Sequence, residues 1–467
     1  MSDVELLRKS LLRDNRNGYD RMDAREKPAM EAYCRDYMDF ISHAKTEREA
    51  VRATIAKAEA AGYRPWAPGM TVTPGDKYYL NNRGKSVYFA HIGNRPLSDG
   101  AHIAAAHIDS PRLDLKPNPL YEDSELAFLK THYYGGIKKY QWTTVPLALH
   151  GVVVLRDGTK VEVCIGERSE DPVLYVTDLL IHLAQEQMKK PLSEGVNAEQ
   201  LNLLVGSRPV EGEGSDRVKL AVLQWLHEYY GITEADFQSA ELCAVPAGAA
   251  RYVGFDKSMI CGYGHDDRVC AYACFTPLLT QPTPEFTSVC LLADKEEIGS
   301  VGVSGMKSRA FETFMEDLCE TQGVSKRRCF EKSFCLSADV TNAFDPDYAE
   351  TCDRRNSAYL NGGIGVCKYT GSRGKSGASD ASAEAMGYVR KLFEDGGVLW
   401  QTSTLGRVDQ GGGGTVAGFM ANRNIVTVDA GVPVVSMHAP LEVVSCLDCY
   451  MTQKAMAVFF QTSQSHE

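Results

Sequence analysis

The first part of the chain changes from helical to strand-like spacing of its apolar residues. Between Pro28 and Ala61 apolar residues recur at helical spacing among charged ones, and Gly62 follows as a C-terminal stop signal. Residues 87–108 then form two β-like runs joined by a loop, and the second run ends in His107-Ile108-Asp109. We therefore expect opening helices followed by two strands.

The pattern changes again after Pro111. Residues 117–250 hold short β-like runs at Thr144–Leu155 and Lys160–Ile165, followed by amphipathic helical patterns at Leu174–Gln187 and Asp216–Tyr230. We interpret this stretch as an inserted domain. It divides the main domain into a first part, residues 1–116, and a second part, residues 251–467.

The last part of the chain alternates strands with helices. This order is typical of an α/β fold in which a parallel or mixed sheet is covered on both faces. The expected strands are Thr287–Ala293, Ser333–Ala338, Ile425–Val428 and Val434–Met437, and helices are expected to begin near Asp267, Ser382 and Leu441.

Composition narrows the functional classes. Hydrophobic residues make up 44% of the 467 residues, which is typical of a globular protein, and the net charge of -11 argues against nucleic acid as a partner. There is no apolar stretch long enough for a signal peptide or a membrane span, so no membrane partner is expected. The 14 cysteines then indicate reduced thiols and a cytoplasmic location, and the pair Cys446 and Cys449 is expected to pack within a helix.

Polar side chains follow several of the expected strands. They are His107 with Asp109, Asp294 through Glu297, Asp339 and His438. Ligands of open α/β sheets bind at the carboxyl ends of the strands, so these groups are expected to converge on one crevice. Each has an ordinary alternative, since a single histidine can be a hydrogen-bonded edge residue and the pair Asp266-Asp267 can favour a helix start electrostatically.

Imidazole and carboxylate groups together suit zinc, cobalt or manganese. Of two adjacent glutamates, one can bind a metal ion while its neighbour faces the activated water as a base. A pair of ions can hold both the attacking oxygen and the substrate carbonyl oxygen. The combined pattern favours a hydrolase with a two-metal site.

Five segments in order carry a family resemblance. AAHIDSPRLDLKP, GYGHDDRVCAY, LLADKEEIGSVGVSG, SADVTNAFDPDY and VVSMHAP together resemble the aspartyl aminopeptidase family of di-zinc peptidases, in particular its bacterial branch. The resemblance also covers the inserted segment, through THYYGGIKKYQW and TDLLIHLAQEQ. It implies a zinc-peptidase α/β/α sandwich with a mixed sheet and an inserted β-rich dimerisation domain.

The resemblance also implies a role for each candidate residue. Glu296 would be the general base, Asp109 would orient a metal-binding histidine, and Asp266 would bridge two divalent ions, zinc or alternatively cobalt or manganese. The implied metal ligands are His107, Asp266, Glu297, Asp339 and His438.

Further implied features concern the substrate and the assembly. Lys368 lies where the family has a basic residue near the substrate pocket, and the loop with Gly412 and Thr415 would line the cleft. In that family the insert mediates dimerisation, dimers form a tetrahedral dodecamer, and a histidine at the position of His182 reaches a neighbouring active site. Here Ile181 replaces the proline that usually precedes that histidine.

The sequence therefore predicts a cytoplasmic metal-dependent aminopeptidase that removes an acidic or neutral N-terminal residue from short peptides. Two alternatives stay open at this point. One is a two-metal carboxypeptidase or amide deacylase of the same fold, and the other is a catalytically idle scaffold or cargo-assembly protein.

Overall fold

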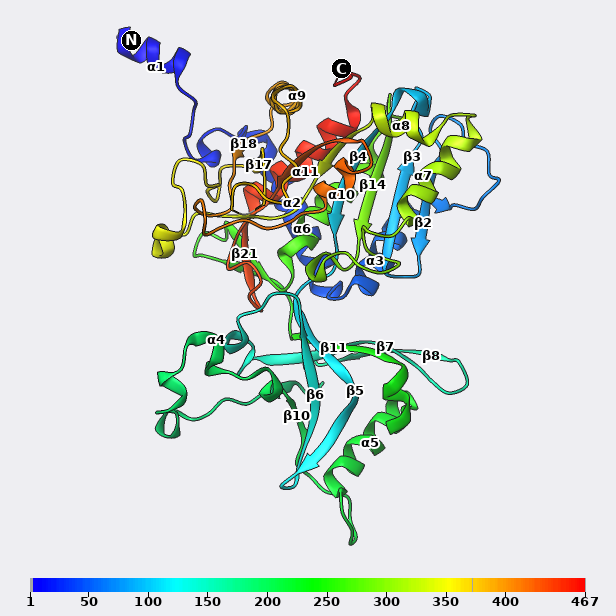
Figure 1. Ribbon diagram of the computed structural model, residues 1–467, viewed down its shortest axis with the longest axis vertical. Coiled ribbons are helices and arrows are strands. Elements are labelled where there is room, and N and C mark those ends of the chain that lie inside the picture. The colour runs from blue at the N-terminus through cyan, green and yellow to red at the C-terminus, as the bar shows by residue number, and fades with distance from the viewer. Residues whose placement is uncertain (1–2, 372, 467) are drawn as a thin grey trace.

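The computed structural model describes residues 3–371 and 373–466 and shows a main lobe with an inserted lobe attached to it (Figure 1). A nine-stranded mixed sheet runs through the main lobe. At its centre β4 (Ala101–His107) is parallel to both β14 (Thr287–Ala293) and β15 (Phe334–Ser337). The full order is β1 (Arg64–Pro65), β2 (Lys77–Asn82), β3 (Ser86–His91), β14, β4, β15, β19 (Val426–Gly431), β17 (Ile364–Cys367) and β18 (Trp400–Thr402).

Helices cover both faces of this sheet. Alternate β4 side chains enter different cores: Ala104 and Ala106 pack on one face, and Ile103 and Ala105 pack on the other. The first core also contains side chains from α2 (Lys27–His43), α3 (Glu47–Ala60), α6 (His265–Thr280), α9 (Ala383–Asp395) and α11 (Cys446–Gln461). The second contains side chains from α7 (Ala310–Thr321), α8 (Lys326–Lys332) and α10 (Ala417–Ala421). The expected α/β/α sandwich is confirmed.

Local signals explain where several helices begin. Thr46 and Glu49 form a reciprocal capping box at the start of α3, and the Ser382 side chain accepts a hydrogen bond from Ala385 N at the start of α9. The opening helices and the helix at Ser382 are therefore as predicted. A further helix, α1 (Asp3–Leu11), extends away from the main lobe (Figure 1).

The inserted lobe is β-rich and has its own core. Its strands are ordered β11 (Ala240–Pro246), β5 (Arg112–Asp123), β6 (Leu126–Tyr134), β10 (Leu203–Gly206), β9 (Leu174–Val176), β7 (Pro146–Val154) and β8 (Lys160–Ile165). Because β11 also pairs with β7, the sheet closes on itself. The helix α5 (Arg217–Tyr230) covers it, in agreement with the predicted helix at Asp216–Tyr230.

The inserted lobe confirms the expected β-rich second domain. The expected boundary between residues 116 and 117 falls within β5, and the one between residues 250 and 251 falls at the start of β12 (Arg251–Val253). The numerical limits of the three segments stay a prediction.

A small third sheet lies beside the main one. It consists of β12, β13 (Met259–Gly262), β21 (Glu442–Ser445), β20 (Pro433–Val435) and β16 (Thr341–Asn342). The predicted helix start at Leu441 is wrong, because β21 comes first and α11 begins at Cys446. The CxxC pair lies on α11 as expected, with both cysteines buried.

The predicted helix at Leu174–Gln187 is also wrong. Leu174 and Val176 are buried on either side of the exposed Tyr175, which is the alternation of a strand, and they form β9. The following Leu180, Ile181 and Leu183 are more than half exposed, so no core formed by the described residues covers them. A short 3₁₀ turn at Ile181–Leu183 stands within the predicted range, and a second turn at Gln187–Lys189 and a four-residue helix, α4 (Leu192–Gly195), follow it.

Within residues 3–371 and 373–466, none of the helices combines the length and apolar character needed to cross a membrane. All 14 cysteines lie in these ranges and none forms a disulfide.

Candidate metal centre

Parallel strands bring the first group of predicted residues to one edge of the main sheet. His107 is the last residue of β4 and pairs with Ala293, directly before Asp294, while Ala105 pairs with Ser337, two residues before Asp339. The carboxyl ends of β4, β14 and β15 therefore meet at the same edge. The sequence-predicted convergence of His107, Asp339 and the Asp294–Glu297 segment follows from this register.

The third sheet brings in the second group. Asp266 follows β13, and His438 lies in the connection between β20 and β21. The buried carboxylate of Glu442 on β21 joins the two segments, because Oε2 accepts the Asp266 N–H at 2.9 Å and Oε1 accepts the His438 N–H at 2.7 Å. Glu442 thereby fixes the backbone of both residues.

Two groups of side chains could each hold a metal ion. The first is His107, Asp266 and Asp339, and the second is Asp266, Glu297 and His438; within each group the ligand atoms lie within 4.8 Å of one another. All five predicted ligands are included, and Asp266 belongs to both groups. The geometry matches a pair of neighbouring sites.

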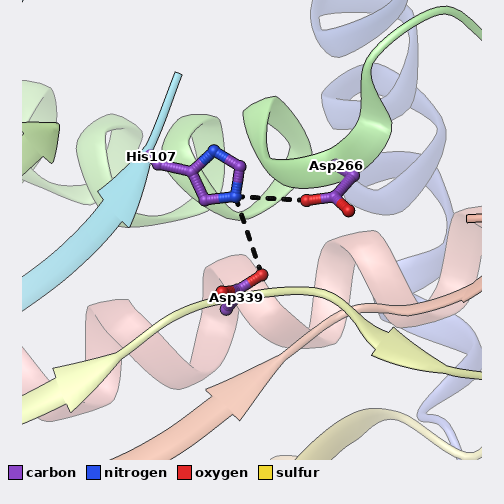
Figure 2. Close-up of side chains that lie close together, drawn as sticks. All are labelled: His107, Asp266 and Asp339. Carbon is purple, nitrogen blue, oxygen red and sulfur yellow. Dashed lines mark ion pairs between the residues drawn. The ribbon is translucent and has the colours of Figure 1, made fainter. Parts of the chain in front are cut away.

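The carboxylate of Asp266 faces the two groups with different oxygens. Its Oδ1 lies 3.2 Å from His107 Nε2, and its Oδ2 lies 3.1 Å from His438 Nε2. Figure 2 shows His107 pointing at Asp266 and at Asp339, whose Oδ1 is 3.8 Å from His107 Nε2. This is the arrangement that a bridging carboxylate needs.

Backbone carbonyls fix the tautomers of both histidines. His107 Nδ1 lies 3.0 Å from the carbonyl oxygen of Asp109, and His438 Nδ1 lies 2.7 Å from that of Gly136. A carbonyl oxygen can only accept, so each Nδ1 carries a hydrogen, and Nε2 is the nitrogen that faces the carboxylates and that would bind a metal ion. Hydrogen bonding of this kind orients metal-binding histidines.

Asp109 holds the two glutamates in place. Its fully buried carboxylate accepts the N–H of Glu296 at 3.1 Å, the N–H of Glu297 at 3.2 Å and the hydroxyl of Tyr134 at 2.8 Å. It also lies 3.3 Å from His107 Nδ1. The predicted orienting residue therefore touches both the histidine and the glutamate backbone.

The electrostatics of this cluster suit cations. Burial raises the pKa of Glu297 well above its ordinary value, and the Asp266 carboxylate adds to this effect. Burial likewise raises the pKa of Asp339. Among the described residues, the buried oxygens Glu297 Oε1 and Asp267 Oδ1 have no hydrogen-bond partner. Imidazole nitrogens, crowded carboxylates and an orphaned oxygen fit divalent ions such as zinc.

Glu296 belongs to neither metal group although it is adjacent to Glu297. Burial raises its pKa to about 7, with repulsion from Asp339 and Asp109 adding to burial and His107 opposing it. A carboxyl group beside the metal groups but outside them is free to accept and return a proton.

The remaining predicted residues lie outside these two groups. His182 is exposed on a 3₁₀ turn of the inserted lobe. Lys368 follows β17 and forms an ion pair with Asp380, which also binds Lys375. Thr415 donates to Asp429 of β19 at 2.8 Å, and Gly412 has a φ of +121° that favours glycine.

Three residues that hold the site together, Tyr134, Gly136 and Glu442, were not identified from the sequence. Tyr134 and Gly136 lie in the inserted lobe, yet they bind Asp109 and His438 of the main lobe. Glu442 is a single buried acid on a strand. The YYGG run within THYYGGIKKYQW was a usable signal, because adjacent glycines allow close backbone approach: a Cβ on Gly135 would lie 3.4 Å from Glu297 Oε2.

Comparisons with known proteins agree with this site. The model of the family described as aminopeptidase I zinc metalloprotease (M18) matches residues 40–460. A probable M18 family aminopeptidase 1 of Clostridium acetobutylicum is 48% identical over 96% of this chain and 98% of its own. A counterpart of Thermotoga maritima is 43% identical over 92% of this chain and 96% of its own.

Solved structures show the same fold. The crystal structure of the M18 aminopeptidase from Thermotoga maritima matches with a TM-score of 0.92 at 40% identity, covering 96% of this chain and all of that one (100%). Aminopeptidase I from Clostridium acetobutylicum matches with a TM-score of 0.91 at 45% identity, covering 97% and 100% of the two chains.

Proposed function

Because the chain belongs to the aminopeptidase I zinc metalloprotease family (M18) and is a metal-dependent aminopeptidase, we propose that Glu296 is its general base. The family match confirms the resemblance to aspartyl aminopeptidases and favours this activity over the carboxypeptidase, deacylase and scaffold alternatives. The observation that carries the proposal is a difference between two adjacent glutamates. Glu297 lies in a metal group, and Glu296 does not.

The five ligands divide into two proposed sites. His107 and Asp339 complete one, Glu297 and His438 complete the other, and Asp266 serves both. Two divalent ions bound there would supply the positive charge that acidifies water and polarises the peptide carbonyl.

Glu296 transfers the proton in the proposed reaction. Its carboxylate accepts a proton from the water whose oxygen forms a bond to the carbonyl carbon of the first peptide bond. When the carbon–nitrogen bond breaks, Glu296 returns the proton to the leaving amine. Asp109 keeps Glu296 at this position through the Glu296 N–H.

The replacement Glu296→Gln tests this role. It removes the proton acceptor but preserves shape, so kcat should fall by at least ~100-fold, while bound metal, measured by plasma mass spectrometry, should stay unchanged. The matched control is Glu228→Gln on α5, which should keep full turnover. Unimpaired turnover of the Glu296 variant would remove this residue from the mechanism.

We propose that the substrates are short peptides with an acidic or neutral N-terminal residue. Lys368 is the proposed contact for an acidic side chain, and Gly412 and Thr415 are proposed to line the cleft. The ion pair with Asp380 partly neutralises Lys368, which moderates any acidic preference. In a panel of aminoacyl anilides, Lys368→Met should lower kcat/KM for aspartyl and glutamyl substrates and leave alanyl substrates unchanged. An equal effect on both classes would exclude Lys368 as a specificity contact.

We also propose that the inserted lobe joins subunits into dimers and that these assemble into a tetrahedral dodecamer. The support is a group of apolar side chains on that lobe, each at least half exposed, namely Leu180 (54%), Ile181 (67%), Leu183 (67%), Met188 (71%) and Leu192 (65%). A solved yeast structure, at 18% identity, carries the description of an mApe1 dodecamer. His182 lies within this apolar group, where it could reach a neighbouring active site.

Light scattering after size-exclusion chromatography tests the assembly. The double replacement Ile181→Ser and Leu183→Ser should reduce the mass, whereas Leu220→Ser, which is 48% exposed on α5, should not. His182→Ala should lower kcat without changing the mass. A monomeric parent protein would contradict the proposal.

We further propose a cytoplasmic location, supported by 14 cysteines without a disulfide in the described chain. Cell fractionation tests it, and recovery from an oxidising compartment would contradict it.

A further inference from the structure

A basic cavity lies where the segment after α1, residues 13–21, meets the main lobe. It has a volume of about 660 Å³, and its lining includes Arg13, Arg16, Arg21, Arg354 and Arg355. None of its lining residues belongs to the two metal groups. The cavity is therefore separate from the centre described above.

Specific contacts hold the walls of this cavity together. Arg13 donates to the Trp400 carbonyl at 2.6 Å, and its guanidinium lies 4.7 Å from the centre of the Trp400 ring. Gly18 N donates to the carbonyl of Asn361, a lining residue, at 2.7 Å. The Gln401 amide in turn binds the carbonyls of Tyr359 and Gly363. Three distant segments are thus docked around one space.

The lining of this cavity includes five arginines and no acidic residue, and the nearby carboxylates of Asp14, Asp20, Asp353 and Glu394 offset part of that charge. Asp14 is the acid that pairs with Arg16 and Arg21. Among the described residues, Arg354 and Arg355 form no salt bridge; Arg354 instead stacks on Phe344, 5.2 Å from the ring centre. Burial lowers the pKa of Arg13, the charge of Arg21 lowers it further, and the carboxylate of Glu394 opposes this effect. This excess of positive charge occurs in a chain of net charge -11.

We propose that this cavity binds a small anion that carries two or more phosphate groups. Guanidinium forks match phosphate oxygens in pairs, and they keep their charge at every physiological pH. Phosphate offers three acceptor oxygens, so one group can bind several arginines, whereas a carboxylate offers two. Five guanidiniums around one space therefore favour a polyphosphate over a simple carboxylate.

Calorimetric titration of the metal-loaded protein with inorganic pyrophosphate tests the proposal. Each titration is repeated in the same metal-containing buffer without protein, so that the heat of metal binding to pyrophosphate is subtracted. The double replacement Arg354→Ser and Arg355→Ser should weaken binding at least tenfold. The matched control, Arg327→Ser and Arg328→Ser, removes two adjacent exposed arginines from α8 and should bind as the parent does. Both variants should keep the parent kcat.

Thermal unfolding gives a second measurement. Pyrophosphate should raise the Tm of the parent and of the control but not that of the cavity variant. If the cavity variant does not fold, the single replacement Arg16→Ser, at a side chain that is 66% exposed, should still weaken binding.

Three results would overturn the proposal. One is equal pyrophosphate binding by all variants. Another is tighter binding of benzene-1,3,5-tricarboxylate than of pyrophosphate, which would indicate a carboxylate site. The third is a changed oligomeric mass of the Arg354 and Arg355 variant without a change in anion binding, which would make the cavity a contact between subunits.

Discussion

Replacing Tyr134 by phenylalanine tests whether the inserted lobe helps to place the proposed catalytic carboxylate. The hydroxyl of Tyr134 donates to Asp109 at 2.8 Å, and Asp109 holds the N–H groups of Glu296 and Glu297. The replacement removes one hydrogen bond to a charged group and leaves the packing of the ring intact.

The expected loss follows from that single bond. A hydrogen bond to a charged partner contributes roughly 1.5–3 kcal/mol, and each 1.4 kcal/mol is a factor of ten. Asp109 keeps its two backbone donors, so the lower end applies and kcat should fall about tenfold. Loss of comparable partners of metal-binding residues reduces metal affinity or activity by roughly 10–100-fold.

The assay separates placement from general destabilisation. We would measure kcat and KM with an aminoacyl anilide at saturating metal, together with metal affinity and Tm. The control Tyr230→Phe removes another hydroxyl of the inserted lobe, which donates to Cys164 O at 3.3 Å, and should leave kcat unchanged. Parent-like kcat and metal affinity in the Tyr134 variant would refute the reasoning.

Three other changes test the metal site and the contact of His150, in the inserted lobe, with Glu49 of the main lobe. Glu442→Gln leaves one oxygen for two backbone donors, so metal affinity measured by competition with a chelator dye should fall; unchanged affinity would contradict its positioning role. Removing metal should lower the Tm in calorimetry, because the carboxylates then repel one another, and an unchanged Tm would argue against this. Burial lowers the pKa of His150, but Cys164, Glu167 and Glu49 outweigh this and raise it to about 11. The protonated His150 contributes fully to the free energy of unfolding below pH ~6.5, and this contribution is lost as the pH rises through about 11. The loss is at most about 1.4 kcal/mol per pH unit. In denaturant titrations, the free energy of unfolding of His150→Gln should therefore decline less with rising pH than that of the parent.

The sequence predicted correctly those elements whose buried positions can be read from the segment itself. The strand Thr287–Ala293 has the predicted limits because every residue is buried, so its apolar run is continuous. His107 and Asp339 could be selected because polar residues that follow such runs lie at the carboxyl edge of the sheet. Glu297 and His438 were candidates for the same reason, and Asp266 was a candidate at a helix start. The family resemblance added the role of each residue, and the structure brings all five together.

The predictions that failed, and the residues that were missed, depend on contacts that the spacing of residue types does not reveal. Ile181 and Leu183 suggested a helix face, but none of the residues in 3–371 and 373–466 covers them. Tyr134 lies 25 residues from Asp109, and Gly136 lies 302 residues from His438. Periodicity carries no information about such pairs.

The hydrogen bond from His438 to the Gly136 carbonyl limits how this enzyme can be shortened or recombined. A chain from which residues 117–250 were excised would retain every proposed metal ligand, yet the ring of His438 would lose the acceptor that sets its tautomer. Transplanting the main lobe alone onto another scaffold should therefore fail, even if it folds. In this architecture the proposed metal site depends on the inserted lobe, so the two lobes have to be kept together.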